Sequence, residues 1–386
     1  MTAPDPPRGF PEAEHRARLA LLQAAMAARG LAALLLTTEA EIRWVTGFLT
    51  RFWESPTRPW FLVVPAQGDP VAVIPSIGAE LMGRTWIRDI RCWSSPDYAD
   101  DGVSLLAATL AERSPPDAEI GLPMGRETRL RMPLADWLAL SERIGRRRFR
   151  DDGGLMRDLR LVKSEAEIEK IAAACAVAGR AFARTPEILR PGLPLSELFR
   201  RFQILCLEEG ADQVPYLAGG AAPGGYGDVI SPASDRPLAR GDVVMLDTGL
   251  SRDGYFADFD RNWSLGPPAP EVADAHARLV EATDVAAGLA RPGATPADLA
   301  QAMRAVLGGG EIDVGRLGHG LGMELTEPPS LIAADLTPLR PGMVLTLEPS
   351  IPLGPGRLLV HEEVIVVRED GPQFLSPRIG PGIPVV

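Results

Sequence analysis

The chain has 386 residues, of which 46% are hydrophobic and 24% are charged, and its formal net charge is -11. This composition is typical of a globular chain that buries a sizeable core in two domains, and it excludes a collagen, a coiled coil and a disordered tail protein. The acidic net charge disfavours nucleic acid and anionic lipid as partners, because both are polyanions.

The sequence contains no signal for export or membrane insertion. Its longest apolar runs fall far short of the roughly 18 to 20 residues that cross a bilayer. The first residues have neither the basic nor the apolar region of a signal peptide. The three cysteines, Cys92, Cys175 and Cys206, are widely spaced and odd in number, which favours reduced thiols. We therefore expect a cytoplasmic protein.

The first part of the chain alternates between helical and extended patterns. The predicted helices span 12–29 and 133–143, and the predicted strands span 31–36, 60–65, 71–75 and 119–123. Such alternation is typical of an α/β domain. The pattern breaks at the polar run 146–154, where two glycines follow a cluster of arginines. We therefore predict an N-terminal domain of residues 1–154 and a C-terminal domain of residues 155–386.

The C-terminal domain contains a near repeat. It opens with a capping box, Ser164 and Glu167, which predicts a long helix to about residue 182. Further on, the run 190–192 (Arg-Pro-Gly) recurs at 291–293, and the run 241–247 has a similar counterpart at 342–348. Both pairs have the same offset of 101 residues. The sequence therefore favours two duplicated half-domains, each a helix pair followed by a hairpin, over a chance recurrence of common turns.

Each predicted hairpin contains two carboxylates. A turn centred between Arg252 and Asp253 would place Asp247 opposite Asp258. A turn centred on Pro355 would place Glu348 opposite Glu362. Like charges on facing residues of paired strands destabilise a sheet.

These carboxylates need a neutralising partner if the strands are buried, as the apolar runs 243–246 and 364–367 indicate. A divalent cation would serve. Two alternatives remain: the carboxylates face solvent from edge strands, or one acid of each pair is protonated.

His319 lies between two glycines, so its imidazole can approach a ligand closely. A lone histidine is usually structural, but beside four carboxylates it becomes a candidate fifth ligand. Four carboxylates balance the charge of two divalent ions when the histidine is neutral. Oxygen-rich ligation with one imidazole suits Mn²⁺, Co²⁺ or Fe²⁺ at least as well as Zn²⁺, so the identity of the metal stays open.

The ordered motifs resemble the creatinase/prolidase/aminopeptidase P family. They are Asp-Thr-Gly at 247–249, Gly-Tyr-x-x-Asp at 254–258, Gly-His-Gly-x-Gly at 318–322, Gly-Met-Val-x-Thr-x-Glu-Pro at 342–349 and Glu-Glu at 362–363. The resemblance is strong over 155–386 and looser before it. It implies an α/β N-terminal domain and an α+β pita-bread C-terminal domain, and a homodimer.

The resemblance also implies a catalytic centre with two divalent metal ions. The residues at the matching positions are Asp247, Asp258, His319, Glu348 and Glu362, with Asp258 and Glu362 as bridging ligands. Asp260 and Arg261, which follow Asp258 closely, are predicted to orient these ligands.

Two histidines that peptidases of this family hold near the scissile carbonyl are missing. Ile230 or a neighbour occupies one position and Thr326 occupies the other. A threonine hydroxyl can donate a hydrogen bond to an oxyanion, but it cannot carry a proton at neutral pH. The part of the mechanism that depends on metal-activated water is unaffected, and Glu348 or Glu327 could carry the proton.

An aromatic and arginine-rich loop in the N-terminal domain is a candidate for substrate binding. Arg51, Trp53 and Arg58 could bind a substrate carboxylate or, through the aromatic ring, a cationic group. The alternative is that the tryptophan belongs to the core and the arginines face solvent.

We therefore expect a metal-dependent hydrolase that cleaves the C–N bond of a peptide or amide in a small substrate or short peptide, similar to an Xaa-Pro peptidase. One alternative is a hydrolase or lyase of a small nitrogenous or onium solute, resembling creatine, ectoine or a sulfoniopropionate. The other is a non-catalytic binding protein that retains the pita-bread fold.

Overall fold

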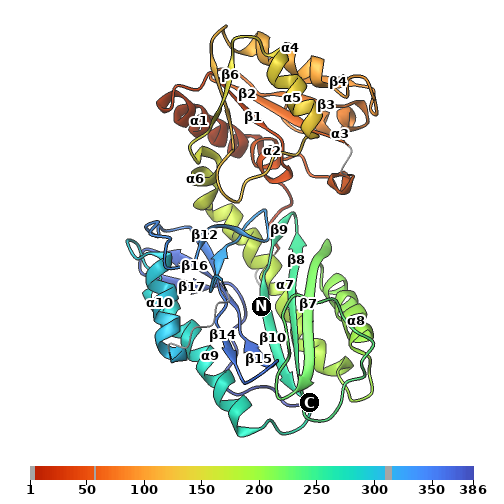
Figure 1. Ribbon diagram of the computed structural model, residues 1–386, viewed down its shortest axis with the longest axis vertical. Coiled ribbons are helices and arrows are strands. Elements are labelled where there is room, and N and C mark those ends of the chain that lie inside the picture. Colours follow the sequence, from red (N-terminus) through yellow and green to blue (C-terminus); the bar gives the residue numbers. More distant parts are fainter. Residues whose placement is uncertain (1–4, 56–57, 309–314) are drawn as a thin grey trace. The chain divides into compact units, whose positions relative to one another are not determined.

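The computed structural model describes residues 5–55, 58–308 and 315–386. It divides into two compact units, one of Pro7–Arg160 and one of Leu161–Val386 with Asp5 and Pro6 (Figure 1). The division falls at the end of helix α6 (Leu155–Leu161), somewhat later than the boundary predicted at 154/155. Among the described residues, no helix is long and apolar enough to cross a membrane.

The N-terminal unit is a six-stranded sheet with helices. Its strands are β1 (Ala33–Leu36), β2 (Phe61–Pro65), β3 (Val71–Pro75), β4 (Asp89–Trp93), β5 (Glu119–Leu122) and β6 (Arg148–Asp151). Its helices are α1 (Glu12–Ala28), α2 (Glu39–Thr46), α3 (Ala79–Gly83), α4 (Val103–Arg113), α5 (Leu134–Arg143) and α6. The order β4-β3-β2-β1-β5-β6 mixes parallel and antiparallel pairs. The α/β class predicted for this region is confirmed.

The predicted elements of this unit are present, with one error at its end. The run 146–154 was predicted to be a break, yet it contains strand β6, which pairs in parallel with β5. Its residues are mostly exposed because β6 is an edge strand, so it lacks the apolar pattern that marks the central strands. Because the residues of this edge strand are charged, hydrophobic periodicity did not predict β6.

In its described residues, the C-terminal unit contains four helices and two main sheets. The helices are α7 (Glu165–Ile188), α8 (Leu195–Glu208), α9 (Pro270–Leu289) and α10 (Pro296–Leu307). The first sheet has the order β10-β8-β7, from β7 (Gln213–Pro223), β8 (Asp242–Arg252) and β10 (Phe259–Ser264), with β9 (Tyr255–Phe256) paired to β8. The second has the order β12-β11-β13-β16-β17, from β11 (His319–Gly320), β12 (Glu327–Ser330), β13 (Val344–Leu347), β16 (Glu363–Arg368) and β17 (Gly371–Phe374). A small hairpin joins β14 (Ser350–Pro352) and β15 (Leu358–Val360).

The two halves repeat each other in backbone detail. The N–H of Gly192 donates to the carbonyl of Leu238, and the N–H of Gly293 donates to the carbonyl of Leu339, at the same offset as in the sequence. Each half thus has a helix pair, a glycine turn and an antiparallel sheet. This α+β arrangement confirms the pita-bread class of the C-terminal domain.

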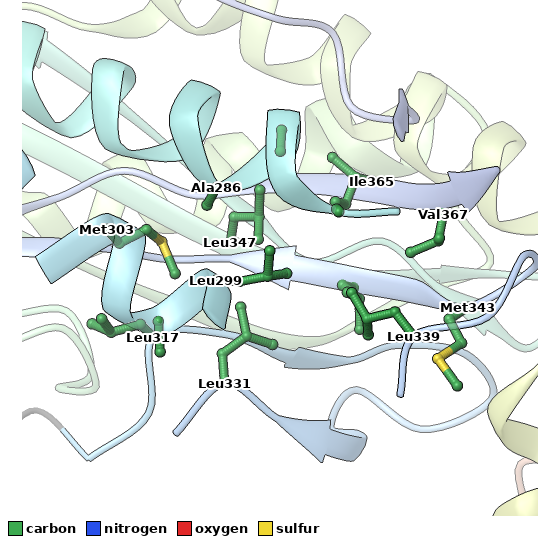
Figure 2. Packing of buried hydrophobic residues seen from close by; sticks show 14 of the residues in the cluster. Ala286, Leu299, Met303, Leu317, Leu331, Leu339, Met343, Leu347, Ile365 and Val367 are labelled. Carbon is green, nitrogen blue, oxygen red and sulfur yellow. The ribbon is translucent and has the colours of Figure 1, made fainter. Parts of the chain in front are cut away.

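The second sheet is held by a continuous apolar core. Figure 2 shows Leu299 and Met303 from α10 and Ala286 from α9 packed toward Leu347 and Ile365 of strands β13 and β16. All of these side chains are fully buried or nearly so. Burial of this kind stabilises the fold by roughly 25 cal/mol per Å² of apolar surface. The strands β13 and β16 are therefore packed against a rigid core.

One of the two predicted hairpin registers is correct. In the second half, Leu347 pairs with Glu363 and Ser350 pairs with Val360, so Glu348 and Glu362 lie at the matching positions between these pairs. This is the register predicted from a turn centred on Pro355.

The predicted register of the first hairpin is wrong by two residues. Asp260, and not Asp258, lies opposite Asp247. The cause is the turn: Asp253 and Gly254 both have positive φ, at 47° and 63°, so they form a two-residue turn one position later than predicted. The Asp253 carboxylate is also paired with the buried ammonium of Lys170. Asp258 instead lies between β9 and β10.

Candidate metal centre

The five predicted ligands come from both half-domains. Asp247 is in the middle of β8 and Asp258 precedes β10, whereas His319 begins β11, Glu348 follows β13 and Glu362 precedes β16. Each of the last four is at or just beyond a strand end, where the chain leaves the ladder and the side chain can turn toward the other sheet.

Three of these residues form one compact cluster. Asp258, His319 and Glu362 are buried, and each offers a ligand atom within 4.8 Å of the others. His319 Nε2 lies 3.5 Å from Asp258 Oδ2 and 3.7 Å from Glu348 Oε1. Asp247 is close enough for its charge to raise the pKa of Asp258. The structure therefore brings all five predicted residues into one region.

The orientation of His319 leaves one ring nitrogen for a ligand. His319 Nδ1 lies 2.9 Å from the carbonyl oxygen of Gly320, which can only accept a hydrogen bond, so Nδ1 carries the proton. The lone pair of Nε2 then points to the carboxylates. Burial lowers the pKa of His319 to about 4, which keeps the imidazole neutral, as metal ligation requires.

The glycines around His319 are required by close backbone packing. A Cβ on Gly318 would lie 2.2 Å from the carbonyl oxygen of Thr346, and one on Gly320 would lie 2.1 Å from that of Pro328. The N–H of His319 also donates to Thr346 Oγ1 at 3.0 Å. The glycines let three strands approach one another and fix the imidazole between them.

The carboxylates repel one another in a buried setting. Burial raises the pKa of Asp247, Asp258 and Glu362 well above the usual range, and the neighbouring carboxylates raise each further. In addition, Asp247 Oδ1 and Glu362 Oε1 are buried and have no hydrogen-bond partner. Buried, unpaired anionic oxygens beside a neutral imidazole fit a bound divalent cation, which would satisfy both.

Glu348 is partly exposed to solvent, as is Asp247, whereas Asp258 and Glu362 are buried. Its side chain is 30% exposed, compared with 6% for Asp258. Burial raises the pKa of Glu348 to about 7, with the charge of Arg316 acting in the opposite direction. Water can therefore reach the carboxylate of Glu348.

The two residues proposed beside the metal ligands have different surroundings. Glu327 is buried and its Oε2 accepts a hydrogen bond from Lys163 Nζ at 3.1 Å, while its Oε1 accepts from the N–H of Glu324. Thr326 is exposed. Ile230, where a family histidine was expected, is 78% exposed. A carboxylate fixed by a lysine ion pair is poorly suited to carry protons.

The sequence did not indicate Tyr216, and for Asp260 it indicated only a role in orienting the ligands. The hydroxyl of Tyr216 on β7 donates to the carbonyl of Val229 at 3.5 Å, and burial together with the nearby charges of Asp247 and Asp258 raises the pKa of this hydroxyl. Asp260, which is 1% exposed, adds a further carboxylate that raises the pKa of Asp247. A tyrosine within a strand has no motif of its own. Asp260 was predicted to orient the ligands because it closely follows Asp258, but only the correct register places it opposite Asp247.

The aromatic loop of the N-terminal unit is held by an arginine that was not predicted. Arg131 donates to the carbonyls of Trp53, Ser55 and Arg58 at 3.0, 2.6 and 2.6 Å. Its guanidinium also lies over the Trp53 ring, which packs against Trp60 at 5.7 Å between centroids.

The three residues proposed to bind substrate are placed as follows. Arg51 is exposed, Arg58 lies over the ring of Phe52, and Trp53 is partly buried in the aromatic cluster. A role of Arg51, Trp53 and Arg58 in substrate binding stays a prediction.

Comparisons with known proteins agree over both units. Residues 169–369 match Metallopeptidase family M24, and residues 18–162 match the Creatinase/Prolidase N-terminal domain. The probable dipeptidase PepE of Mycobacterium tuberculosis is 32% identical over 371 residues, which cover 94% of this chain and 95% of the relative. The Xaa-Pro dipeptidase of Pyrococcus furiosus is 31% identical over 240 residues, which cover 59% of this chain and 66% of the relative. The crystal structure of dipeptidase PepE from Mycobacterium ulcerans has a TM-score of 0.84 at 31% identity and covers 98% of this chain and 99% of that one.

Proposed function

The chain belongs to metallopeptidase family M24, and from this membership we propose that it is a dipeptidase. It is a metallohydrolase that cleaves a peptide C–N bond. The observation that carries the proposal is the buried cluster of Asp258, His319 and Glu362 in a chain that matches dipeptidases over almost its whole length.

Membership of this family implies divalent metal ions. We propose that two are bound, by Asp247, Asp258, His319, Glu348 and Glu362, because four carboxylate charges and a neutral imidazole balance two divalent cations. The metal is Mn²⁺, Co²⁺, Fe²⁺ or Zn²⁺. When bound, such ions act as Lewis acids and lower the pKa of water, which supplies the nucleophile.

The protein's own residues orient the ligands and handle the proton. The carbonyl of Gly320 fixes the His319 ring, and Tyr216 lies close enough to Asp247 for the charge of that carboxylate to affect its hydroxyl. Glu348 is the proton carrier in this proposal because it combines proximity to His319 with access to solvent. Glu327 is not, because Lys163 holds its carboxylate.

Arg316 is suited to recognise the C-terminal carboxylate of a dipeptide. Its Nη1 donates to Ser330 Oγ at 3.1 Å, and Ser330 is the strand partner of His319. Its charge also affects His319 and Glu348, since it acts to lower the pKa of both. A partly buried guanidinium beside the candidate ligands can pair with a substrate carboxylate in two hydrogen bonds. This would restrict the enzyme to short peptides.

A substrate panel tests the proposal. The protein is stripped with a chelator, reloaded with Mn²⁺ or Co²⁺, and assayed on Xaa-Pro dipeptides, other dipeptides, tripeptides, creatine and ectoine. We expect dipeptides to be cleaved, and the chelator to abolish cleavage. Turnover of creatine or ectoine without dipeptide cleavage would favour the nitrogenous-solute alternative. Bound metal without turnover of any compound would favour a binding protein.

Two further expectations belong to this proposal. We propose that the enzyme is a homodimer and that it acts in the cytoplasm on a short peptide. Light scattering of the purified protein measures the first, and cell fractionation measures the second.

A further inference from the structure

Four buried charged or polar side chains form a closed ring next to the candidate ligand Glu362. Asp260 and Arg261 come from β10 in the first half-domain, and His361 and Glu363 flank Glu362 in the second. Their exposed fractions are 1%, 5%, 0% and 2%. Burial of four such groups is costly unless they satisfy one another.

An imidazole lies between two carboxylates in this ring. His361 Nδ1 is 3.7 Å from Asp260 Oδ1, and His361 Nε2 is 3.3 Å from Glu363 Oε1. The other oxygen of Glu363 accepts from Arg261 Nη2 at 3.1 Å and from the hydroxyl of Ser376. His361 thus lies between an acid of one half-domain and an acid of the other, within ion-pair distance of both, although neither ring nitrogen makes a hydrogen bond to a described residue.

The ring closes on the peptide groups of Glu362. The N–H of Glu362 donates to Asp260 Oδ1 at 2.7 Å, and its carbonyl accepts from Arg261 Nη1 at 3.0 Å. Asp260 and Arg261, which are consecutive in β10, therefore bond the N–H and the carbonyl of Glu362, a candidate metal ligand in the other half-domain. The position of the Glu362 side chain relative to Asp258 depends on this contact.

We propose that His361 is a positioning residue for the metal centre, which keeps Asp260 and Glu363 in place so that they fix the backbone of Glu362. Without the imidazole, Asp260 and Glu363 would lose a shared polar neighbour. Asp260 would keep the amide of Asn262 at 3.3 Å on one oxygen, but it would lose the ring that faces the oxygen to which the Glu362 N–H donates. The inference rests on the proposed function, because it assumes that Glu362 binds metal.

His276 provides a matched control. It is as fully buried as His361, and the two rings lie 6.1 Å apart between centroids. Its Nδ1 lies 2.9 Å from the carbonyl oxygen of Pro381. Replacing either histidine with methionine removes a buried imidazole from the same region, but His361 faces the carboxylates of Asp260 and Glu363, whereas the polar contact of His276 is to Pro381.

Titration with Co²⁺ tests the proposal by its visible absorption spectrum and by calorimetry, without any assay of activity. We expect His361→Met to weaken Co²⁺ binding about 10- to 100-fold, as loss of a residue that orients a ligand does, and to change the spectrum. His276→Met should retain the affinity and spectrum of the unaltered protein. His361→Gln, which restores a polar group, should recover part of the affinity.

Asp260→Asn extends the test if His361→Met does not fold. It retains an oxygen for the Glu362 N–H but removes the charge that faces His361, so it should weaken Co²⁺ binding to a smaller degree. Wild-type affinity in His361→Met, or in Asp260→Asn when the first variant does not fold, would overturn the positioning role. Equal losses in His361→Met and His276→Met would overturn it as well. A failure of the unaltered protein to bind Co²⁺ would instead refute the proposed metallohydrolase.

Discussion

At the scale of single residues, the proposed function assigns the length of the substrate to Arg316. The ligands of the cluster are common to any chemistry that needs a metal-activated water, so they say little about what is cleaved. The guanidinium of Arg316 donates to Ser330, the strand partner of His319, and in the proposed function this positive charge would pair with the carboxylate of a dipeptide. Specificity of this kind depends on one contact and can be removed by one substitution.

We expect Arg316→Met to raise the KM for dipeptides about 10-fold or more, because a charge-assisted hydrogen bond to a carboxylate contributes about 1.5 to 3 kcal/mol. The KM for the corresponding dipeptide amide, which has no carboxylate, should change little. Steady-state kinetics on the two substrates measure the difference. Arg316→Lys is the control and should recover part of the affinity. Equal increases in KM for acid and amide would contradict a role in carboxylate recognition.

At the scale of elements, the repeat offers a matched pair of glycines. Gly241 and Gly342 occupy equivalent turns with φ of 89° and 88°. A Cβ on Gly241 would meet no atom within 4 Å, whereas one on Gly342 would lie 2.8 Å from the carbonyl oxygen of Lys163. The N–H of Lys163 also donates to the carbonyl of Gly342 at 2.9 Å.

The two alanine variants should therefore differ in stability, although the two glycines have the same backbone conformation. We expect Gly241→Ala to lower the free energy of unfolding by about 1 to 2 kcal/mol, the cost of a left-handed backbone for an L-residue. Gly342→Ala should cost about 1 to 3 kcal/mol more, because it also overpacks against Lys163. Urea denaturation of the metal-free proteins measures both. Equal losses of unfolding free energy would mean that the left-handed backbone, and not packing against Lys163, sets the cost at both positions.

The two hairpins also show how far the sequence predicts this fold and site. The register around Pro355 was correct because that turn is flanked symmetrically by Gly354 and Gly356, which leaves its centre unambiguous. The other register was wrong because Asp253 adopts a positive φ that its residue type permits but does not require. Turn geometry, and not the pattern of the strands, decided which acid faces Asp247.

Within the site, residues in repeated or spaced motifs could be found, and isolated ones could not. Asp247, Asp258 and Glu362 were predicted as acids in apolar strands, and His319 was predicted from its flanking glycines. The roles of Tyr216 and His361 depend on which strands lie side by side. No spacing along the chain encodes that information, because it arises from tertiary packing.

At the scale of the whole molecule, buried histidines give the stability a dependence on pH. Burial, aided by the charge of Arg18, lowers the pKa of His15 in the N-terminal unit to about 4, below the usual value of 6.5. Below pH 6.5 the His15 imidazole is therefore protonated in the unfolded chain, whereas in the folded chain it stays neutral until the pH falls to about 4. The stability from this group is complete above pH 6.5 and is lost progressively as the pH falls toward 4.

We expect His15→Gln to reduce the loss of stability between pH 6.5 and 4, by about 3 kcal/mol at most, since one pKa unit corresponds to 1.36 kcal/mol. Melting temperatures of the metal-free protein and the variant across this range measure the effect as a difference. The comparison is needed because the acid cluster acts with the opposite sign: pKa values raised by burial favour the folded state as the pH falls. A constant difference between the two proteins at all pH values would contradict the assignment to His15.

The two lysines of the chain are both enclosed in ion pairs, Lys163 with Glu327 and Lys170 with Asp253, and their side chains are 2% and 3% exposed. An amine-acylating reagent therefore finds no accessible lysine side chain on the native protein. Acylation of Lys163 or Lys170 requires the C-terminal unit to open first. The rate at which each lysine is modified, measured by mass spectrometry, would thus report how often the structure opens around that lysine's ion pair.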